Sequence, residues 1–169
     1  MSGIRQTLMH PRAVQPGQLR SMDITDLDAV MDIERSAYAF PWTRGNFVDS
    51  VAACYRMMVL RREDSKQIIG YYVGMLGVQE MHLLNVTVAP SHQSQGWGVA
   101  MLDDLCSASR SLSASKLWLE VRRSNGRALQ LYERYGFQTV GMRKAYYPAP
   151  LGQREDALVM SLSLIPEAA

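Results

Sequence analysis

The segment LLNVTVAPSHQSQGWGVAML, residues 83–102, decides the fold that the sequence predicts. A β-rich run ends at Pro90, a polar loop follows, and an apolar run of helical character begins near Gly96. Gly96 and Gly98 stand where that helix starts, although glycine destabilises a helix. Glycines in a strand-to-helix loop let a bound anion approach backbone N–H groups, and the helix N-terminus adds partial positive charge. The segment therefore predicts an anion-binding loop.

The order of residues in this loop disfavours two familiar phosphate-binding motifs. The G-K-[S/T] of a nucleoside-triphosphate loop is missing, and no G-x-G-x-x-G of a dinucleotide-binding fold follows the strand. Residues 93–98 instead read QSQGWG, which fits the pattern Q/R-x-x-G-x-G/A. The alternative interpretation is that the two glycines only form a turn and a helix cap.

The length and composition of the chain indicate an ordinary globular domain. With 169 residues, 47% hydrophobic and 20% charged, it is large enough for one domain with a substantial core. A net charge of +2 without a basic run gives no support for a nucleic-acid partner. No run approaches the ~20 apolar residues of a membrane span, and the first residues lack the apolar core of a signal peptide. We therefore expect a cytoplasmic protein with no nucleic-acid or membrane partner.

The cysteines and histidines give no sign of a metal site. Cys54 and Cys106 form no C-x-x-C pair, which fits buried thiols in a reducing compartment. The three histidines show no spacing typical of metal ligands. No metal cofactor is expected.

Local patterns predict a mixed α/β chain with hairpins at both ends and a strand-loop-helix-strand unit in the middle. Residues 1–18 show no periodicity and are expected to form a loose extension or an edge segment, and residues 19–169 a single domain. The predicted strands are residues 19–22, 55–62, 67–78, 81–89, 116–121, 137–146 and 155–164. The predicted helices begin near Thr25, Thr43, Gly96 and Asn125, and Gly136 ends the last of them.

Five segments, in this order along the chain, resemble the GCN5-related N-acetyltransferase (GNAT) family. They are AYAFPW (37–42), LLNVTVAP (83–90), the glycine loop, LWLEVRRSNGRALQLYERYGF (117–137) and AYYPAPLGQREDALVM (145–160). The resemblance covers nearly the whole chain from about Leu19 and is closest to the ribosomal-protein-alanine N-acetyltransferases of that family. It implies the GNAT fold, a central, mostly antiparallel twisted sheet of six to seven strands that is splayed in the middle and flanked by about four helices.

The resemblance implies acetyl-CoA as cosubstrate and assigns residues to it. The pyrophosphate is expected on the loop, and the pantetheine arm on the main chain at the end of the central strand, although that strand also fits an ordinary core position. Many members carry basic residues where Ser94 and Val99 stand here, so we expect acetyl-CoA binding that is weaker and less sensitive to salt. The expected cofactor-binding residues are Val86, Thr87, Val88, Gln93, Ser94, Gln95, Gly96, Trp97, Gly98, Val99, Asn125 and Tyr132.

Glu120 is the candidate general base. It lies in LWLEV, a strand otherwise apolar enough to be buried, where a carboxylate is costly unless it is paired or used. Burial is expected to raise its pKa toward neutrality, which suits a base. The resemblance implies that this glutamate accepts the proton of the amine through water. The alternative is a structural ion pair with Arg122 or Arg143.

Tyr132 is the candidate general acid. It lies on the helix that follows the strand of Glu120, and helical spacing also fits a core aromatic residue. It matches the tyrosine of the L-Y-x-x-x-G-F pattern, whose role in the family is to protonate the departing thiolate. Asn125 is expected to cap the same helix, and the resemblance adds a contact with the pantetheine arm.

The acceptor is expected to be the N-terminal amine of a protein. At pH 7, neutralising an α-amine costs roughly 1.1 kcal/mol and a lysine roughly 4.6 kcal/mol, so one carboxylate suits the α-amine better. The resemblance places Pro41, Trp42, Tyr146 and Tyr147 along the groove that admits a peptide N-terminus, although they also fit packing aromatics at loop ends. It makes the N-terminal alanine of a ribosomal protein the leading substrate. The alternatives are acetylation of lysine or a small-molecule amine, and an acyl-CoA-binding module without activity.

Overall fold

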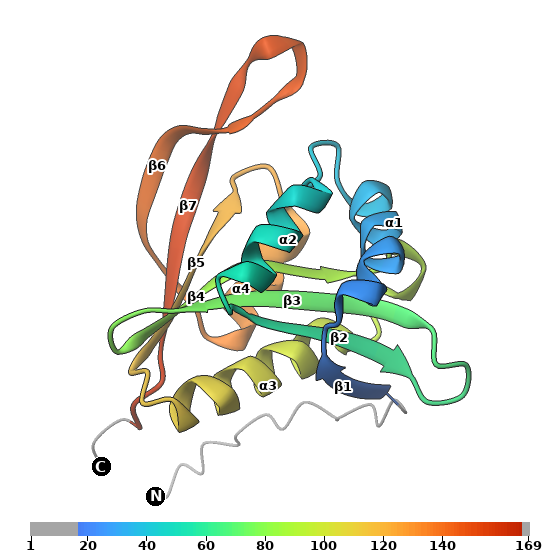
Figure 1. Ribbon diagram of the computed structural model, residues 1–169. Coiled ribbons are helices and arrows are strands. Elements are labelled where there is room, and N and C mark those ends of the chain that lie inside the picture. The colour runs from blue at the N-terminus through green and yellow to red at the C-terminus, as the bar shows by residue number, and fades with distance from the viewer. Residues whose placement is uncertain (1–16, 167–169) are drawn as a thin grey trace, which may run out of the picture.

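The computed structural model describes residues 17–166 (Figure 1). Strand β1 (Gly17–Ser21) begins the described part at the edge of the sheet, so residues 17 and 18 fit the edge segment and not the loose extension of the prediction. The rest of that extension, residues 1–16, lies outside the described residues. Within the described part, no helix is both long enough and apolar enough to cross a membrane.

A seven-stranded sheet forms the centre of the molecule, with strand order β1-β2-β3-β4-β5-β7-β6. All neighbouring strands are antiparallel except β4 and β5, which are parallel. This confirms the predicted mixed, mostly antiparallel sheet. The strands after β1 are β2 (Arg56–Arg62), β3 (Ile68–Leu76), β4 (Glu80–Val88), β5 (Lys116–Arg122), β6 (Gln138–Pro148) and β7 (Arg154–Ser163).

The four helices begin and end at residues whose side chains or backbone favour those positions. The side chain of Thr43 accepts from the backbone N–H of Asn46, and Asn125 accepts from Ala128. Gly136 ends its helix in the left-handed region with φ 118°. The helices are α1 (Leu27–Ala37), α2 (Arg44–Ala52), α3 (Trp97–Ser111) and α4 (Gly126–Tyr135).

The helices cover both faces of the sheet and create two hydrophobic cores. The α1–α2 pair packs on one face, against β2 and β3 residues that include Val59, Tyr71 and Val73. On the other face α3 and α4 cover a larger core that includes Leu117 and Leu119 of β5. Figure 1 shows α3 crossing the sheet opposite α1 and α2. Side chains that alternate along β5 therefore point to opposite faces of the sheet, and those of Leu117 and Leu119 face α3 and α4.

The sheet splays between β4 and β5, as the resemblance implies. Their ladder runs from Glu80 paired with Lys116 to Leu83 paired with Leu119, and both strands continue beyond it without pairing. The β3–β4 register shifts at the same level, which makes Leu84 an extra residue in β4. Such a bulge bends its strand and increases the twist. The bulge therefore turns β4 away from β5 where the ladder ends.

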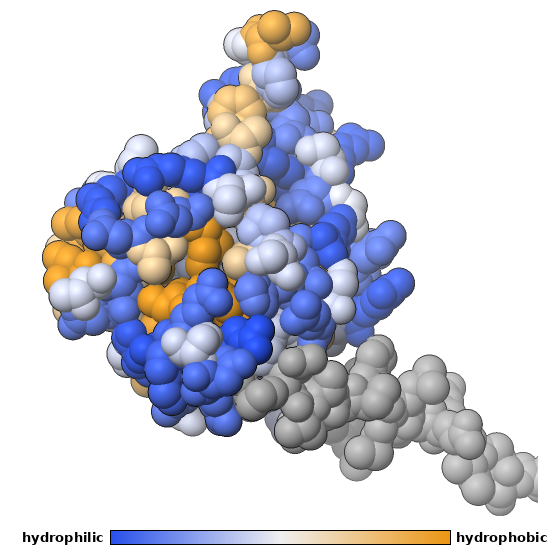
Figure 2. Space-filling view, turned by 90° about the vertical axis from the view of Figure 1, so that its right-hand side faces the viewer, coloured by the Kyte–Doolittle hydropathy of each residue, from blue (hydrophilic) through white to orange (hydrophobic). Residues whose placement is uncertain are grey.

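The β6–β7 hairpin extends beyond the rest of the sheet (Figure 1). Leu151, in the turn between the two strands, is 97% exposed, and the tip appears hydrophobic in Figure 2. Figure 2 looks onto the side where β4 ends, and it also shows hydrophobic side chains in a hollow with a hydrophilic rim.

Candidate active site

A pocket of about 300 Å³ occupies the space where β4 and β5 separate. Because the strands are unpaired there, residues from both faces of the sheet reach the same space. Glu120 of β5 lines it, and so does Tyr132, which comes from α4 on the opposite face. Of the residues predicted from the sequence, the pocket is lined by Trp42, Val86, Glu120, Asn125, Tyr132 and Tyr147.

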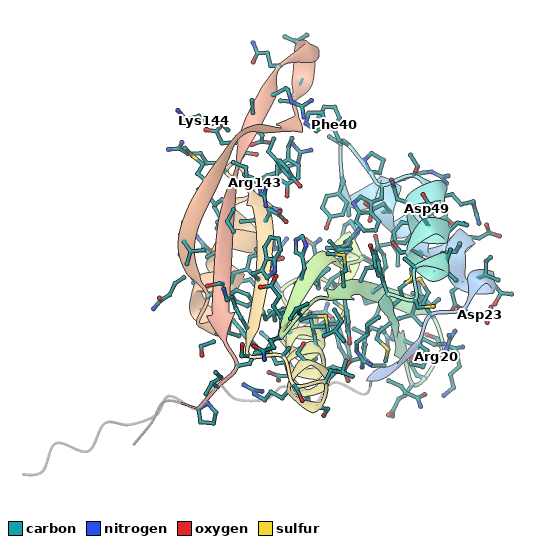
Figure 3. All side chains as sticks on the ribbon, turned by 60° about the vertical axis from the view of Figure 1, so that its left-hand side comes forward. Arg20, Asp23, Phe40, Asp49, Arg143 and Lys144 are labelled. Carbon is teal, nitrogen blue, oxygen red and sulfur yellow. The ribbon has the colours of Figure 1, made fainter. Side chains whose placement is uncertain are left out.

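Both carboxylate oxygens of Glu120 have partners. The side chain is 8% exposed, with Oε2 at 2.6 Å from Nε2 of His82 and Oε1 at 3.2 Å from Nε of Arg143. Figure 3 shows Arg143 on β6 and Phe40 on the loop after α1, which approach this region from separate parts of the chain. Arg122 instead pairs with Glu155 at 2.7 Å. The sequence thus named one of the partners, Arg143, and missed His82.

The prediction that burial raises the pKa of Glu120 toward neutrality is wrong. Burial does raise it and is the largest single effect. The hydrogen bond from His82, the charge of His82 and the charge of Arg143 together outweigh burial, so the pKa lies below the ordinary value of a glutamate. Glu120 is therefore ionised at neutral pH.

Tyr132 remains a phenol at neutral pH. Burial raises its pKa, and the nearby hydroxyls of Tyr38 and Tyr147 act in the same direction. The ring packs edge-on against Phe137 at 5.5 Å between centroids. Tyr132 thus belongs to the hydrophobic core and also lines the pocket, with its hydroxyl protonated.

Glycine is needed at the two positions of the loop for different reasons, which are backbone conformation at Gly96 and close packing at Gly98. Gly96 precedes α3 in the left-handed region with φ 89°, and no atom lies within 4 Å of where a Cβ would stand. At Gly98 a Cβ would meet Leu131 of α4 at 3.1 Å, so this glycine permits α3 and α4 to pack closely. The Trp97 side chain is buried in the core, which leaves only its backbone for a ligand. The loop thus presents the open N-terminus of α3.

Arg127 is a residue of this loop region that the sequence did not indicate. It lies in the first turn of α4, and its guanidinium contacts the Gln93 side-chain oxygen and the Ser94 hydroxyl. The Gln93 amide in turn donates to the carbonyl of Val88 at 3.1 Å. The loop lacks a basic residue at Ser94 and Val99, but a neighbouring helix brings a positive charge to it. This revises the expectation that charge contributes little there.

The end of β4 is held by side chains as well as by the sheet. The Tyr38 hydroxyl lies 2.7 Å from the Thr87 hydroxyl and 3.3 Å from the Val86 carbonyl. Thr87 also donates to the Asn85 side chain at 2.7 Å, so its hydroxyl is engaged within the protein. Burial raises the pKa of Tyr38 to about 12. The Thr87 hydroxyl is therefore not free for a ligand, whereas Val86 of the same segment lines the pocket.

Glu34 is a second carboxylate of the pocket that the sequence analysis missed. It is 1% exposed and accepts from the backbone N–H of Trp42 at 2.8 Å and from the Asn85 amide at 3.1 Å. The Tyr71 hydroxyl donates to it as well. Glu34 occupies a position on the buried face of α1, one turn after Val30. The sequence could have indicated Glu34, because it is an acidic residue at a position of the helix that the apolar pattern predicts to be buried.

The four predicted acceptor-binding residues divide into two pairs. Trp42 and Tyr147 line the pocket, and the Arg122 guanidinium lies 4.6 Å from the Tyr147 ring centroid. Pro41 and Tyr146 are exposed neighbours of these residues and do not line it. Phe40, which the sequence analysis did not name, does line it. The role of all four stays a prediction.

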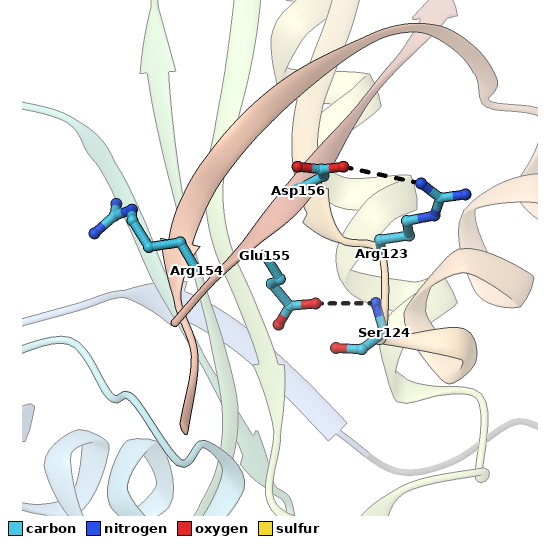
Figure 4. Close-up of a pocket in the computed structure, with 5 residues that line it drawn as sticks. All are labelled: Arg123, Ser124, Arg154, Glu155 and Asp156. Atoms are coloured by element: carbon cyan, nitrogen blue, oxygen red, sulfur yellow. Dashed lines mark hydrogen bonds and ion pairs between the residues drawn. The ribbon is translucent and has the colours of Figure 1, made fainter. Parts of the chain in front are cut away.

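A second, polar pocket of about 370 Å³ lies beside the hairpin (Figure 4). The carboxylate of Asp156 lies 3.9 Å from Arg123, and Glu155 accepts from the backbone N–H of Ser124 at 3.2 Å. These contacts join the loop after β5 to β7. Its two carboxylates are each paired with an arginine, and Arg154 donates to backbone carbonyls of β6.

The pocket between β4 and β5 combines the groups that acyl transfer from a thioester requires. An ionised carboxylate and a protonated phenol face one space, and a strand with unpaired backbone leads from it to a helix N-terminus. An ionised carboxylate can accept a proton and a phenol can donate one, and a helix N-terminus suits an anionic group.

Comparisons with known proteins agree with this geometry. The model of the acetyltransferase (GNAT) family matches residues 27–137. The [ribosomal protein bS18]-alanine N-acetyltransferase of Escherichia coli K12 is 36% identical over 86% of this chain and 97% of its own length. That of Haemophilus ducreyi is 35% identical over 82% of this chain and 94% of its length. The crystal structure of the E. coli ribosomal-protein-S18-alanine N-acetyltransferase superposes with a TM-score of 0.80 at 34% identity, covering 90% and 96% of the two chains. The resemblance read from the five segments is confirmed.

Proposed function

The chain belongs to the acetyltransferase (GNAT) family and is an N-acetyltransferase, and from this premise we propose that it acetylates the N-terminal alanine of ribosomal protein bS18, with acetyl-CoA as donor. The observation that carries the proposal is the pocket between β4 and β5, which both Glu120 and Tyr132 line. The relatives support the choice of acceptor, because they are named for acetylation of bS18 and this chain matches them over nearly their whole length. We also propose that one domain, beginning near residue 19, carries the activity.

The residues of the loop and of β4 fit acetyl-CoA. The open side of Gly96 leaves room for a pyrophosphate at the N-terminus of α3, and Arg127 adds a positive charge. The main chain after Leu83 has no partner on β5 and suits the amides of a pantetheine arm. Asn125 lines the pocket while it caps α4. Bound there, acetyl-CoA supplies the acetyl group as a reactive thioester.

Glu120 accepts the proton that the amine loses, through a water molecule. A carboxylate with a lowered pKa is a weak base toward a free ammonium group, but an amine nitrogen becomes far more acidic once it bonds to the acetyl carbon. Glu120 is therefore suited to remove the proton after attack has begun. This requires an acceptor that is partly neutral at pH 7, and an α-amine with a pKa of ~7.8 meets this condition better than lysine.

Tyr132 donates a proton to the sulfur that leaves. Its raised pKa keeps the phenol protonated across the range in which the α-amine is neutral. The hydroxyl comes from the face of the sheet opposite to Glu120. Proton removal and proton delivery thus occur on opposite sides of the same pocket.

The test is acetylation of peptides followed by mass spectrometry. A peptide with the N-terminal sequence of bS18 should gain one acetyl group on its α-amine, and the same peptide with a blocked terminus should gain none. Acetylation of a lysine in the blocked peptide would overturn the choice of acceptor. Glu120→Gln and Tyr132→Phe should lower kcat and leave acetyl-CoA affinity nearly unchanged, and a wild-type protein that binds acetyl-CoA without turnover would identify a binding module instead.

A further inference from the structure

We propose that His82 is a positioning residue, whose ring N–H fixes the carboxylate of Glu120 and keeps it ionised in the pocket. This inference rests on the proposed function, because it assumes that Glu120 handles the proton of the amine. His82 does not line the pocket and acts through Glu120.

The position of His82 follows from the register of the parallel strands. His82 of β4 stands beside Trp118 of β5, one pair before the ladder ends at Leu83 and Leu119. Glu120 lies two residues beyond Trp118, so both side chains project from the same face of β5. The His82 side chain reaches Glu120 with Nε2 at 2.6 Å from Oε2. The contact therefore bridges the two strands at the point where they separate.

The ring of His82 is held in one orientation. It stacks on the Trp118 indole with centroids 3.6 Å apart and an interplanar angle of 11°. The His82 side chain is 11% exposed, so little room remains for another rotamer. An ionised carboxylate only accepts hydrogen bonds, which requires that Nε2 of His82 carry the proton. Stacking and hydrogen bonding thus fix both the ring plane and the protonated nitrogen.

The other groups around Glu120 do not replace His82. Arg143 of β6 is 49% exposed, so solvent screens its charge more strongly than that of a buried partner. Tyr147 of β6 and Tyr132 of α4 are neutral phenols at neutral pH, because burial raises the pKa of each. Glu34 from α1 lines the same pocket and, as an acidic residue, supplies no positive charge. His82 is therefore the buried group that opposes the effect of burial on Glu120.

The direct test is the titration of the Glu120 carboxyl carbon by NMR in protein labelled with ¹³C-glutamate. The resonance is assigned by its absence in Glu120→Gln. In His82→Leu the pKa of Glu120 should rise by roughly one to three units, since burial is then opposed only by Arg143 and a backbone hydrogen bond. His82→Gln, which keeps an N–H donor without a charge, should give a smaller rise, and Trp118→Leu a smaller one still. An unchanged pKa in His82→Leu would overturn the proposal.

The pH dependence of kcat/KM should also change in His82→Leu. Below the pKa of the amine, kcat/KM of the wild type falls about tenfold per pH unit, because one proton must leave. In His82→Leu a second proton binds to Glu120, and the fall should approach a hundredfold per unit at the acid end. A purely structural loss would lower the rate equally at every pH and would contradict the inference.

Two measurements separate the failure of this inference from that of the proposed function. Acetyl-CoA affinity by calorimetry shows whether each variant is folded, and His82→Gln serves where His82→Leu does not fold. If Glu120→Gln keeps the full rate, the proposed mechanism fails, while the NMR titration still decides whether His82 sets the charge of Glu120. If Glu120→Gln is inactive but the pKa of Glu120 is the same in His82→Leu as in the wild type, only this inference fails.

Discussion

The pocket contains two buried glutamates whose surroundings differ in one respect. Glu34 accepts hydrogen bonds from a backbone N–H, an amide and a phenol, all of them neutral donors fixed on different elements. Glu120 faces a histidine and an arginine, which carry or can carry positive charge. The three neutral donors tie Glu34 to three separate segments, which suits a structural role, whereas the partners of Glu120 lower its pKa, which suits the proton transfer proposed for it. Removing each should therefore affect a different property.

The largest expected effect is on the rate of Glu120→Gln. We expect kcat to fall about a thousandfold, because an amide cannot accept the proton. The free energy of unfolding should fall by only about 1 kcal/mol, since the amide oxygen still accepts from His82. Steady-state kinetics and urea unfolding of the same preparation give both numbers. A large loss of stability with only a modest loss of kcat would mean that Glu120, and not Glu34, has the structural role.

Glu34→Ala should show the opposite pattern, with a loss of about 3 kcal/mol in the free energy of unfolding. The substitution leaves three donors without their acceptor and releases the backbone of Trp42. Urea unfolding measures the loss. Glu133→Ala, at an exposed position of α4, is the matched control and should change stability by less than about 0.5 kcal/mol. If Glu34→Ala is as stable as the wild type but inactive, the comparison between the two glutamates fails.

Arg127→Ala should have a smaller effect that is confined to the donor. We expect KM for acetyl-CoA to rise about fivefold with kcat unchanged, because an exposed guanidinium beside an anion contributes modestly. The dependence of KM on salt should weaken as well. Arg134→Ala, exposed near the end of the same helix, is the control that should change neither. An unchanged KM and salt dependence in Arg127→Ala would restore the expectation that backbone groups alone hold the pyrophosphate.

The smallest expected effect concerns stability in acid. Because the pKa of Glu120 is lowered in the folded protein, its stabilising contribution is fully present above the ordinary pKa of glutamate and is lost as the pH falls through the folded value. The difference in unfolding free energy between the wild type and Glu120→Gln should therefore shrink toward zero below about pH 4.3. Urea unfolding at a series of pH values measures it. A difference that grows in acid would mean that burial dominates and that the pKa is raised after all.

The sequence predicted the elements and the two residues proposed for proton transfer, and the reasons are local. Caps and breakers such as Thr43, Asn125 and Gly136 fix helix ends through contacts within a few residues. The pattern around Glu120 and Tyr132 is contiguous and needs no knowledge of the fold. The first residue of β1 was misplaced because Gly17 and Gln18 have no strand periodicity and gain their partners from β2.

The residues that the sequence missed depend on contacts between distant segments. His82 reaches Glu120, and Arg127 reaches Ser94, only because the sheet and the helices bring their elements together. The prediction of a raised pKa for Glu120 was wrong for the same reason, which is that its partners are distant in the sequence. Burial can be judged from an apolar strand, but the charges that oppose burial come from β4 and β6.

The sequence by itself thus determined the family, the order of the elements and the residue types available for the chemistry, because these depend on patterns over neighbouring residues. The tertiary structure alone decided the direction in which the pKa of Glu120 moves, the three donors that Glu34 binds and the place where positive charge reaches the loop. Hydrogen bonds and charges act over a few ångströms in space, and the partners of Glu120, Glu34 and Ser94 lie on other strands and helices.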